Sequence, residues 1–172
     1  MENTAAGLAA LELGAFLKNT KVDIYLAALS VEAHKAFSEL LLLAGKNDIS
    51  LEVKKRADRA REVLAEKFWV EEEKKYAHAL TVEGKPLAET TVWPSMPLFL
   101  KQLPQQRADF VLDVFTSSEM TTDWGVRSLS PQSSSYDPLN YNYGTVWPFL
   151  TGYACLSEYN YGREPAAFSL LM

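Results

Sequence analysis

Apolar residues recur at helical spacing along most of the chain. Residues 22–44 are apolar nearly all round, and a helix of that kind is expected to be buried on most of its faces. Residues 51–69 differ, because their apolar positions form one stripe opposite a charged surface. The stripe consists of Val53, Ala57, Ala60, Val63, Leu64 and Phe68. A wrapped helix followed by a one-sided helix predicts the inner and outer helices of a two-layer α/α structure.

The remaining segments extend this helical pattern and interrupt it in two places. Residues 73–91 contain an apolar alternation around the turn-like sequence Val82-Glu83-Gly84-Lys85, which predicts a small inserted β-hairpin. Residues 121–144 are rich in Gly, Pro, Ser, Asn and Asp and predict a long ordered loop, a kind of segment that is usually functional. Four more segments are predicted helices: 8–17, 93–103, 106–116 and 146–161. We expect one all-α domain over residues 1–172.

The tetrapeptide Thr-Val-Trp-Pro occurs twice, at residues 91–94 (the first repeat) and 145–148 (the second repeat). Because the chain has only 4 Trp and 8 Pro, chance is a poor explanation for an identical copy. A Thr hydroxyl can cap a helix, and Pro is tolerated in a first turn. Each repeat therefore predicts a helix start with a Trp at its mouth, and together they suggest similar helix pairs that present aromatic residues at one end.

The composition and charge of the chain argue against several classes of function. With 48% hydrophobic and 23% charged residues, the chain can bury a core. The net charge is −5 and no dense Lys/Arg cluster stands beside aromatic residues, which argues against nucleic acid as a partner. No apolar run of membrane-spanning length and no signal peptide are present, so we expect no membrane association and a cytoplasmic setting. No zinc spacing, phosphate loop or Ser-His-Asp signature is present, and neither a metal nor a cofactor is expected.

Aromatic and charged residues gather in the long loop and at the second repeat. They are Trp124, Arg127, Tyr136, Asp137, Tyr141, Tyr143 and Trp147. Aromatic faces can stack on the apolar C–H faces of a sugar ring, while Arg and Asp can bond to its hydroxyls. The alternative interpretation is that these aromatic residues only hold a long loop in place, and composition alone leaves both open.

Two stretches of this region resemble a known family. Residues 123–130, Asp-Trp-Gly-Val-Arg-Ser-Leu-Ser, and residues 136–148, Tyr-Asp-Pro-Leu-Asn-Tyr-Asn-Tyr-Gly-Thr-Val-Trp-Pro, resemble the glucosidase domain of glycogen debranching enzymes and related bacterial amylo-α-1,6-glucosidase-like proteins. The resemblance continues upstream and covers nearly the whole chain. It departs at Tyr143, where relatives often have His or Asn. These proteins are six-hairpin glycosidases, so the resemblance implies a partial (α/α)6 toroid.

The same resemblance implies a function. Such enzymes hydrolyse α-glucosidic bonds with inversion, using a general acid and a general base roughly 6.5–9.5 Å apart. It places Glu2 near the position of the acid and the base beyond Met172. The chain is therefore expected to be truncated at both ends, inactive alone, and prone to self-association through an uncovered apolar face. The implied partner is an α-glucan or another oligosaccharide, and the candidate binding residues are Trp124, Arg127, Tyr136, Asp137, Tyr143 and Trp147.

A second function class competes with this one. The chain could be a non-catalytic helical remnant that binds carbohydrate or serves as a scaffold. The sequence that flanks this chain would separate the two classes, because an upstream β-sandwich and a downstream loop containing Pro-Glu would identify a truncated enzyme.

Overall fold

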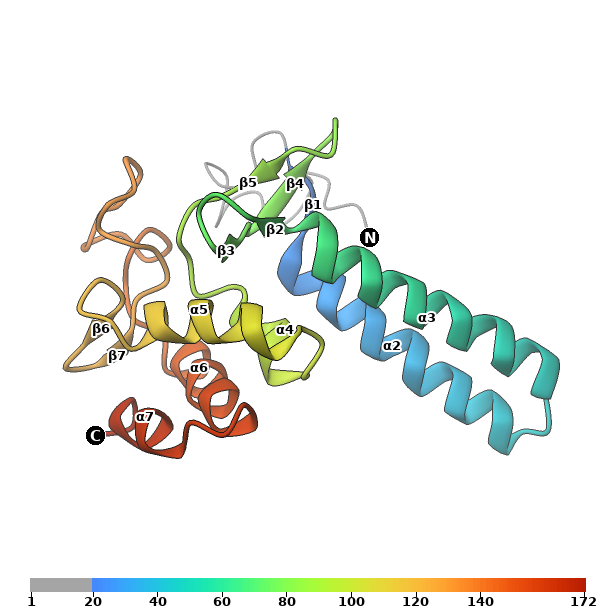
Figure 1. Ribbon diagram of the computed structural model, residues 1–172. Coiled ribbons are helices and arrows are strands. Elements are labelled where there is room, and N and C mark those ends of the chain that lie inside the picture. The colour runs from blue at the N-terminus through green and yellow to red at the C-terminus, as the bar shows by residue number, and fades with distance from the viewer. Residues whose placement is uncertain (1–19) are drawn as a thin grey trace.

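The computed structural model describes residues 20–172 (Figure 1). Its helices are α2 (Ile24–Leu43), α3 (Asn47–Lys67), α4 (Ser95–Phe99), α5 (Gln105–Phe115), α6 (Pro148–Asn160) and α7 (Glu164–Ser169). Its strands are β1 (Thr20–Asp23), β2 (Trp69–Val70), β3 (Lys75–Tyr76), β4 (Ala79–Thr81), β5 (Pro86–Leu87), β6 (Thr121–Thr122) and β7 (Gly125–Val126). The predicted helix over residues 8–17 and the candidate acid Glu2 lie outside the described residues.

Helices α2 and α3 form a long antiparallel hairpin that projects from the rest of the molecule (Figure 1). The predicted stripe of α3 is confirmed at Val53, which is 7% exposed, and at Leu64, which is 2% exposed, but it is wrong at Val63, which is 37% exposed. The opposite face of α3 carries exposed ion pairs such as Arg59–Glu62, 3.0 Å apart. One apolar stripe and one charged surface thus make α3 a one-sided helix, as its sequence indicates.

The prediction that the helix of residues 22–44 is buried on most faces is wrong for the described chain. Its second half leaves Phe37 53%, Leu40 62% and Leu43 85% exposed. Among the described elements, only α3 runs along this half, whereas the first turns of α2 also meet α4 in the body of the molecule. A helix that is apolar on all sides can be buried, but its sequence does not show whether other elements pack against it.

The inserted β-hairpin is confirmed, and it is part of a larger sheet than predicted. Strands β4 and β5 pair antiparallel around a turn in which Gly84 has a φ of 78°. Strand β1 joins the other edge of β4, so that the order is β1-β4-β5. Strand β1 therefore includes Val22 and Asp23, which were predicted to begin the helix of residues 22–44. Helix α2 begins after Asp23, whose carboxylate caps it by accepting a hydrogen bond from Leu26 N at 2.7 Å.

The body contains α4, α5, α6 and α7. Helices α5 and α6 match their predicted ranges closely, and Gly162 follows α6 with a φ of 77°. The predicted helix over residues 93–103 is wrong in length, because α4 has five residues. It ends where Lys101 adopts a φ of 53° and Gln102 N donates to Pro97 O at 2.9 Å, an arrangement that closes a helix.

The core joins these elements in one cluster. The first turns of α2 and the end of α3 pack against α4, α5 and α6. Its largest fully buried apolar side chains include Ile24, Leu64, Tyr76, Leu98, Leu112, Phe115 and Met120. The expected all-α class is therefore corrected to a mostly helical fold with three small antiparallel sheets. Among the described helices, none has the length and apolar character needed to cross a membrane.

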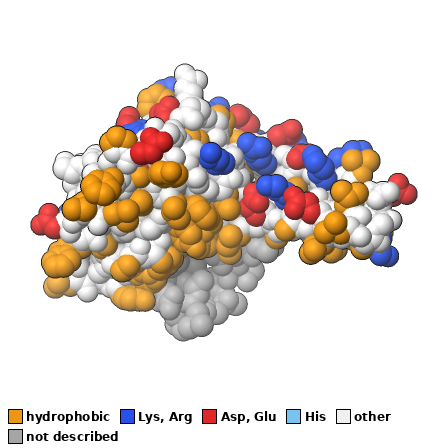
Figure 2. Space-filling view, turned by 90° about the horizontal axis from the view of Figure 1, so that it is seen from below, with side chains coloured by type: hydrophobic (Ala, Val, Ile, Leu, Met, Phe, Trp, Pro, Cys, Tyr) orange, Lys and Arg blue, Asp and Glu red, His pale blue; other side chains and the backbone are white. Residues whose placement is uncertain are grey.

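Figure 2 shows how apolar side chains are distributed on one face of the molecule. They gather over the body and again near the far end of the α2–α3 hairpin, while charged side chains follow the hairpin's other edge. The exposed residues at that end include Phe37, Leu40, Leu43, Ile49 and Leu51. Exposed apolar side chains that gather in one place often mark a contact surface.

Candidate functional site

A short backbone segment brings the two repeats together. Residues 127–130 run between them, and hydrogen bonds extend from this segment to both sides. Val92 N in the first repeat donates to Ser128 O at 3.2 Å, and Ser128 N donates to Thr145 O in the second repeat at 3.0 Å. Isolated bridges on either side of Ser128 continue the same pairing. The long loop thus fixes the two tryptophans of the repeats relative to each other.

The threonines of the repeats do not cap helices, and that part of the prediction is wrong. Thr91 Oγ1 accepts a hydrogen bond from Trp93 N at 3.3 Å, before α4 begins. Thr145 Oγ1 accepts from Trp147 Nε1 at 3.1 Å. Both hydroxyls therefore organise the local chain around a Trp instead of the first helical turn. The predicted placement of each Trp beside a helix start is nevertheless confirmed, since α4 and α6 follow directly.

The tryptophans of both repeats line one cavity of about 210 Å³. The first turn of α2 supplies a third ring, and the long loop supplies polar groups. The lining residues are Tyr25, Trp93, Ser128, Asn142, Trp147, Phe149 and Leu150. We call this the aromatic cavity. Segments from three distant parts of the sequence meet in it.

Neighbouring rings fix the orientation of the aromatic walls. Tyr25 and Trp93 meet edge to face, with ring centroids 5.8 Å apart and planes at 82°. Trp147 lies between Tyr141, at 4.5 Å, and Phe149, at 5.4 Å. The indole N–H of Trp147 donates to Tyr141 O at 2.9 Å, which fixes the orientation of this ring at the cavity that it lines. Rings held in this way are preorganised surfaces for stacking.

Polar groups of the loop complete the aromatic cavity. Asn142 Oδ1 is buried and has no hydrogen-bond partner among residues 20–172. Ser128 Oγ lies close by, accepting from Gly144 N at 3.1 Å. Burial, reinforced by Tyr153, raises the pKa of the Tyr25 phenol, so this group is a neutral hydrogen-bonding group of the lining. An unpaired buried acceptor costs about 1–3 kcal/mol, and a ligand that donates a hydroxyl to Asn142 would recover part of it.

Three of the six predicted binding residues, Trp147, Trp124 and Arg127, lie in different places in the structure. Trp147 lines the aromatic cavity. Trp124 lies in the turn between β6 and β7, 86% exposed, and does not line it. Arg127 turns back on the loop, where its Nη1 donates to Glu119 O at 3.1 Å and Thr121 O at 3.0 Å. These bonds give Arg127 a clear structural role beside the predicted contact with sugar.

The other three predicted residues organise the loop. The ring of Tyr136 packs on Gly144, whose φ is 141° and where an added Cβ would meet that ring at 2.3 Å. Asp137 Oδ1 accepts from Leu139 N at 3.0 Å, and Asp137 N donates to Tyr143 O at 2.7 Å. Such contacts are typical of turns and agree with the alternative that part of the aromatic loop is structural.

Sequence reasoning did not name Tyr25, Trp93, Ser128 or Asn142 as site residues. The signal for Trp93 was present in the repeat, whereas Asn142 carries no pattern of its own. The lining of the aromatic cavity contains no carboxylate within the described chain. What these residues provide is therefore ring stacking and hydrogen bonding, without a pair of groups for proton transfer. Among residues 20–172, no three His, Cys, Asp or Glu side chains are grouped as a metal site would require.

Comparison with known families gives one match over most of the chain. The model of the mannosylglycerate hydrolase MGH1-like glycoside hydrolase domain matches residues 13–172. No curated protein matches the chain.

Solved structures support the same relationship at the level of fold. The GH63 mannosylglycerate hydrolase from Thermus thermophilus in complex with glucose has a TM-score of 0.74 and 24% identity, with 87% of this chain and 37% of that chain covered. The same enzyme in complex with Tris and D-glycerate gives 0.72 and 24%, covering 87% and 36%. A sialidase gives 0.76 at 11% identity, covering 89% of this chain and 15% of that one.

The chain thus spans a little over a third of the length of the hydrolase structures. It matches part of a GH63 (α/α)6 toroid, and the expected six-hairpin glycosidase relationship is confirmed. The closer assignment to glycogen debranching enzymes is replaced by the MGH1-like family.

Proposed function

Because the chain belongs to the mannosylglycerate hydrolase MGH1-like glycoside hydrolase domain family, we propose that its aromatic cavity binds one sugar ring of a glycoside that the intact enzyme hydrolyses. The observation that carries this proposal is the convergence of Tyr25, Trp93 and Trp147 on one small cavity. Three oriented rings around a space of about 210 Å³ suit a single pyranose ring rather than a stretch of polymer.

The binding mode follows from the lining of the cavity. One C–H face of the pyranose stacks against the indole of Trp147, whose orientation is fixed by its bond to Tyr141 O. A sugar hydroxyl donates to Asn142 Oδ1, the buried acceptor that lacks a partner among the described residues. Ser128 Oγ, next to Asn142, provides a second polar group for an adjacent hydroxyl. Arg127 and Trp124 would act further out, on parts of the substrate beyond this ring.

Hydrolysis with inversion needs two carboxyl groups on opposite sides of the scissile bond. The described lining of the aromatic cavity supplies neither, so this region contributes binding and orientation. We propose Glu2 as the general acid, on the resemblance stated above. The resemblance places the base in a loop that follows the helix equivalent to α6. Tested alone, the 172-residue chain is expected to bind sugar without measurable turnover.

Two substrate classes fit this site. The resemblance to debranching enzymes suggests an α-glucan, whose terminal glucosyl residue would enter the cavity. The relatives named mannosylglycerate hydrolase suggest a small glycoside of glycerate instead, and one of their structures holds glucose. Because the cavity accommodates one ring, both classes share a terminal hexose as the recognised group.

A panel of ligands tests the proposal. Intrinsic Trp fluorescence of the chain would be followed during titration with maltose, isomaltose, glucosylglycerate and mannosylglycerate, with glycerol as a control. Saturable quenching by one glycoside class and not by glycerol supports a hexose site, and the preferred member identifies the class. No quenching by any of the four glycosides would contradict the proposal. Release of hexose that is abolished by Glu2→Gln would show that the chain itself completes a catalytic site.

The exposed end of the α2–α3 hairpin supports a second proposal, that the chain self-associates there. Leu40 and Leu43 are 62% and 85% exposed on one helix end. Sedimentation of the wild-type chain should show dimers or larger species, and a Leu40→Lys, Leu43→Lys double variant should be monomeric. A monomeric wild-type chain at high concentration would contradict this proposal.

A further inference from the structure

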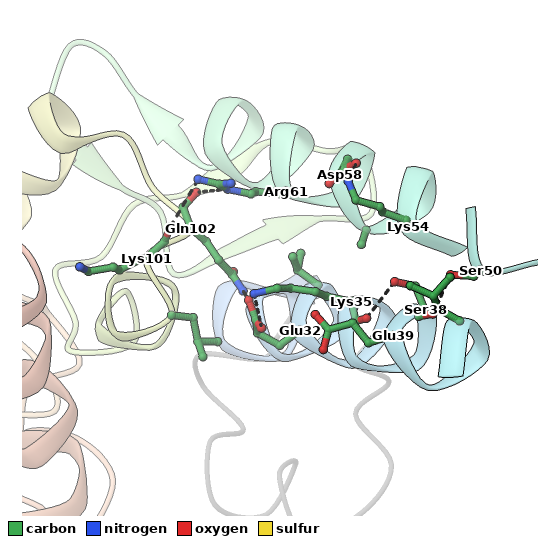
Figure 3. A pocket seen from close by; sticks show the side chains of 14 residues that line it. Glu32, Lys35, Ser38, Glu39, Ser50, Lys54, Asp58, Arg61, Lys101 and Gln102 are labelled. Carbon is green, nitrogen blue, oxygen red and sulfur yellow. Dashed lines mark hydrogen bonds and ion pairs between the residues drawn. The ribbon is translucent and has the colours of Figure 1, made fainter. Parts of the chain in front are cut away.

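A second cavity lies between α2, α3 and the end of α4, away from the aromatic cavity (Figure 3). It measures about 440 Å³ and is reached along the middle of the α2–α3 hairpin, whereas the aromatic cavity begins at the first turn of α2. Its volume falls within the roughly 300–1,000 Å³ typical of small-molecule sites. Its charged lining residues are Glu32, Lys35, Glu39, Lys54, Asp58, Arg61 and Lys101.

A buried amide forms the inner end of this cavity. Gln102 is 2% exposed, and its Nε2 donates to Ala28 O at 3.0 Å and Glu32 Oε1 at 3.2 Å. These two acceptors fix which side of the amide carries the nitrogen. The opposite atom, Gln102 Oε1, is buried and has no hydrogen-bond partner in the described part of the chain. The cavity thus offers an acceptor that a ligand must meet with an O–H or N–H donor.

The charges around Gln102 largely neutralise one another. Glu32 Oε2 and Lys35 Nζ are 3.6 Å apart, and Lys54 and Asp58 are 2.9 Å apart. Arg61 Nε donates to the backbone oxygen of Gln102 at 3.2 Å. No field of a single sign remains to select a phosphate, a nucleotide or a polycation. What remains is a dense set of donors and acceptors around a small space, which matches a neutral ligand with several hydroxyl groups.

We propose that this cavity is a second, non-catalytic site for a neutral polyhydroxylated small molecule, a mono- or disaccharide, one of whose hydroxyls donates to Gln102 Oε1. Because this oxygen is buried, the ligand reaches it only after a neighbouring side chain moves, and Figure 3 places Lys35 beside the amide of Gln102. The Lys35 side chain is 60% exposed, and its ion pair with Glu32 is long, so its movement costs little. The carboxylate of Glu39 and the ammonium of Lys54 then accept from and donate to the remaining hydroxyls.

The test is a nuclear magnetic resonance titration of the 172-residue chain with D-glucose and with maltose. We expect a saturable shift of the Gln102 side-chain amide signals and of backbone amides along the facing sides of α2 and α3. A Glu39→Ala, Lys54→Ala double variant, altered only at exposed side chains that contact the ligand, should bind at least about fivefold more weakly at this site. Glu52→Gln, an exposed carboxylate on α3 outside the lining, is the matched control and should bind as the wild type does.

Further outcomes separate this proposal from the sugar site proposed above. Trp147→Ala should remove shifts at the aromatic cavity and leave those at Gln102 unchanged. Shifts confined to residues around Trp93 and Trp147 would overturn the second site and leave the first standing. The second site would also be overturned if glycine, a zwitterion, moved the Gln102 signals and neither sugar did, or if the double variant bound as the wild type does.

Discussion

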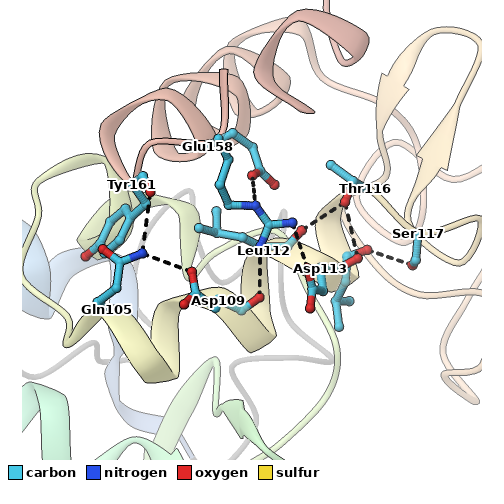
Figure 4. Close-up of polar contacts among 10 residues, drawn as sticks. Gln105, Asp109, Leu112, Asp113, Thr116, Ser117, Glu158 and Tyr161 are labelled. Carbon is cyan, nitrogen blue, oxygen red and sulfur yellow. Dashed lines mark hydrogen bonds and ion pairs between the residues drawn. The ribbon is translucent and has the colours of Figure 1, made fainter. Parts of the chain in front are cut away.

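Replacing Glu158 by Gln should flatten the pH dependence of the stability of this fold. Glu158 is fully buried in α6, and its carboxylate meets the guanidinium of Arg163, with Oε2 and Nε 2.9 Å apart (Figure 4). Arg163 is shared, because its Nη2 also bonds to Asp113 Oδ1 at 2.6 Å and its Nη1 to Asp109 O at 3.2 Å. The guanidinium of Arg163 therefore pairs with two carboxylates, that of Glu158, which is buried, and that of Asp113, which is exposed.

This environment raises the pKa of Glu158 from 4.5 to about 7. Burial is the main cause, Arg163 opposes it, and the nearby Asp113 and Asp109 add to it. Because the folded pKa lies above the unfolded value, the native state holds the proton more tightly. The contribution of Glu158 to stability is thus fully present below pH 4.5 and is lost as the pH rises through about 7. At about 1.36 kcal/mol for each unit of pKa, the rise from 4.5 to about 7 corresponds to a total loss of about 3 kcal/mol, most of which falls between pH 5 and pH 8.

Urea unfolding at about pH 5 and about pH 8 measures this effect. Between these values the wild-type chain should lose up to about 3 kcal/mol more unfolding free energy than Glu158→Gln, whose amide does not titrate in this range. Glu164→Gln, which changes an exposed carboxylate in the first turn of α7, is the matched control and should keep the wild-type dependence. Equal pH dependence of the wild type and Glu158→Gln would refute the reasoning.

Other substitutions test the packing of helix α3 and of the long loop that leads into α6. Leu64→Ala should cost about 2–5 kcal/mol of unfolding free energy, because Leu64 is 2% exposed in the core. Val63→Ala, at a 37% exposed neighbour, should cost less than about 1 kcal/mol, and equal losses would argue against the described face of α3. Gly144→Ala should destabilise the loop by at least about 1–3 kcal/mol, since φ is 141° and Tyr136 occupies the space. Gly152→Ala, in open space on α6, should be neutral or stabilising in the same denaturation assay.

The sequence predicts the elements of this fold better than it predicts their neighbours. The exposed and buried sides of helix α3 could be predicted because its charged residues lie on one side, and that side faces the solvent. For α2 the same reasoning failed. Apolar residues on every side of a helix do not indicate which of them are exposed, and Leu40 and Leu43 lie exposed at the end of α2. Strand β1 was missed because its pairing with β4 joins residues far apart in the sequence, a contact that local patterning does not encode.

The candidate site was predictable in part for a similar reason. Trp147 was identified because it follows a recognisable loop. Trp93 had the same tetrapeptide around it, but its approach to Trp147 depends on the backbone of Ser128 pairing with both repeats. Arg127 was assigned to sugar because of its charge, while the structure shows part of its guanidinium bonded to carbonyl groups of its own loop. Residue types thus indicated the chemistry, and long-range pairing decided which residues meet.

Calorimetric titration of the chain with the preferred glycoside tests the central claim most directly. The aromatic cavity predicts that Trp147→Ala weakens binding about tenfold or more, because one stacking wall is lost. Trp124→Ala, at a ring that is 86% exposed outside the cavity, should change the affinity less than about twofold for a ligand with one hexose ring. Unchanged affinity of Trp147→Ala together with loss of binding in Trp124→Ala would contradict the account and move the sugar site to the turn between β6 and β7.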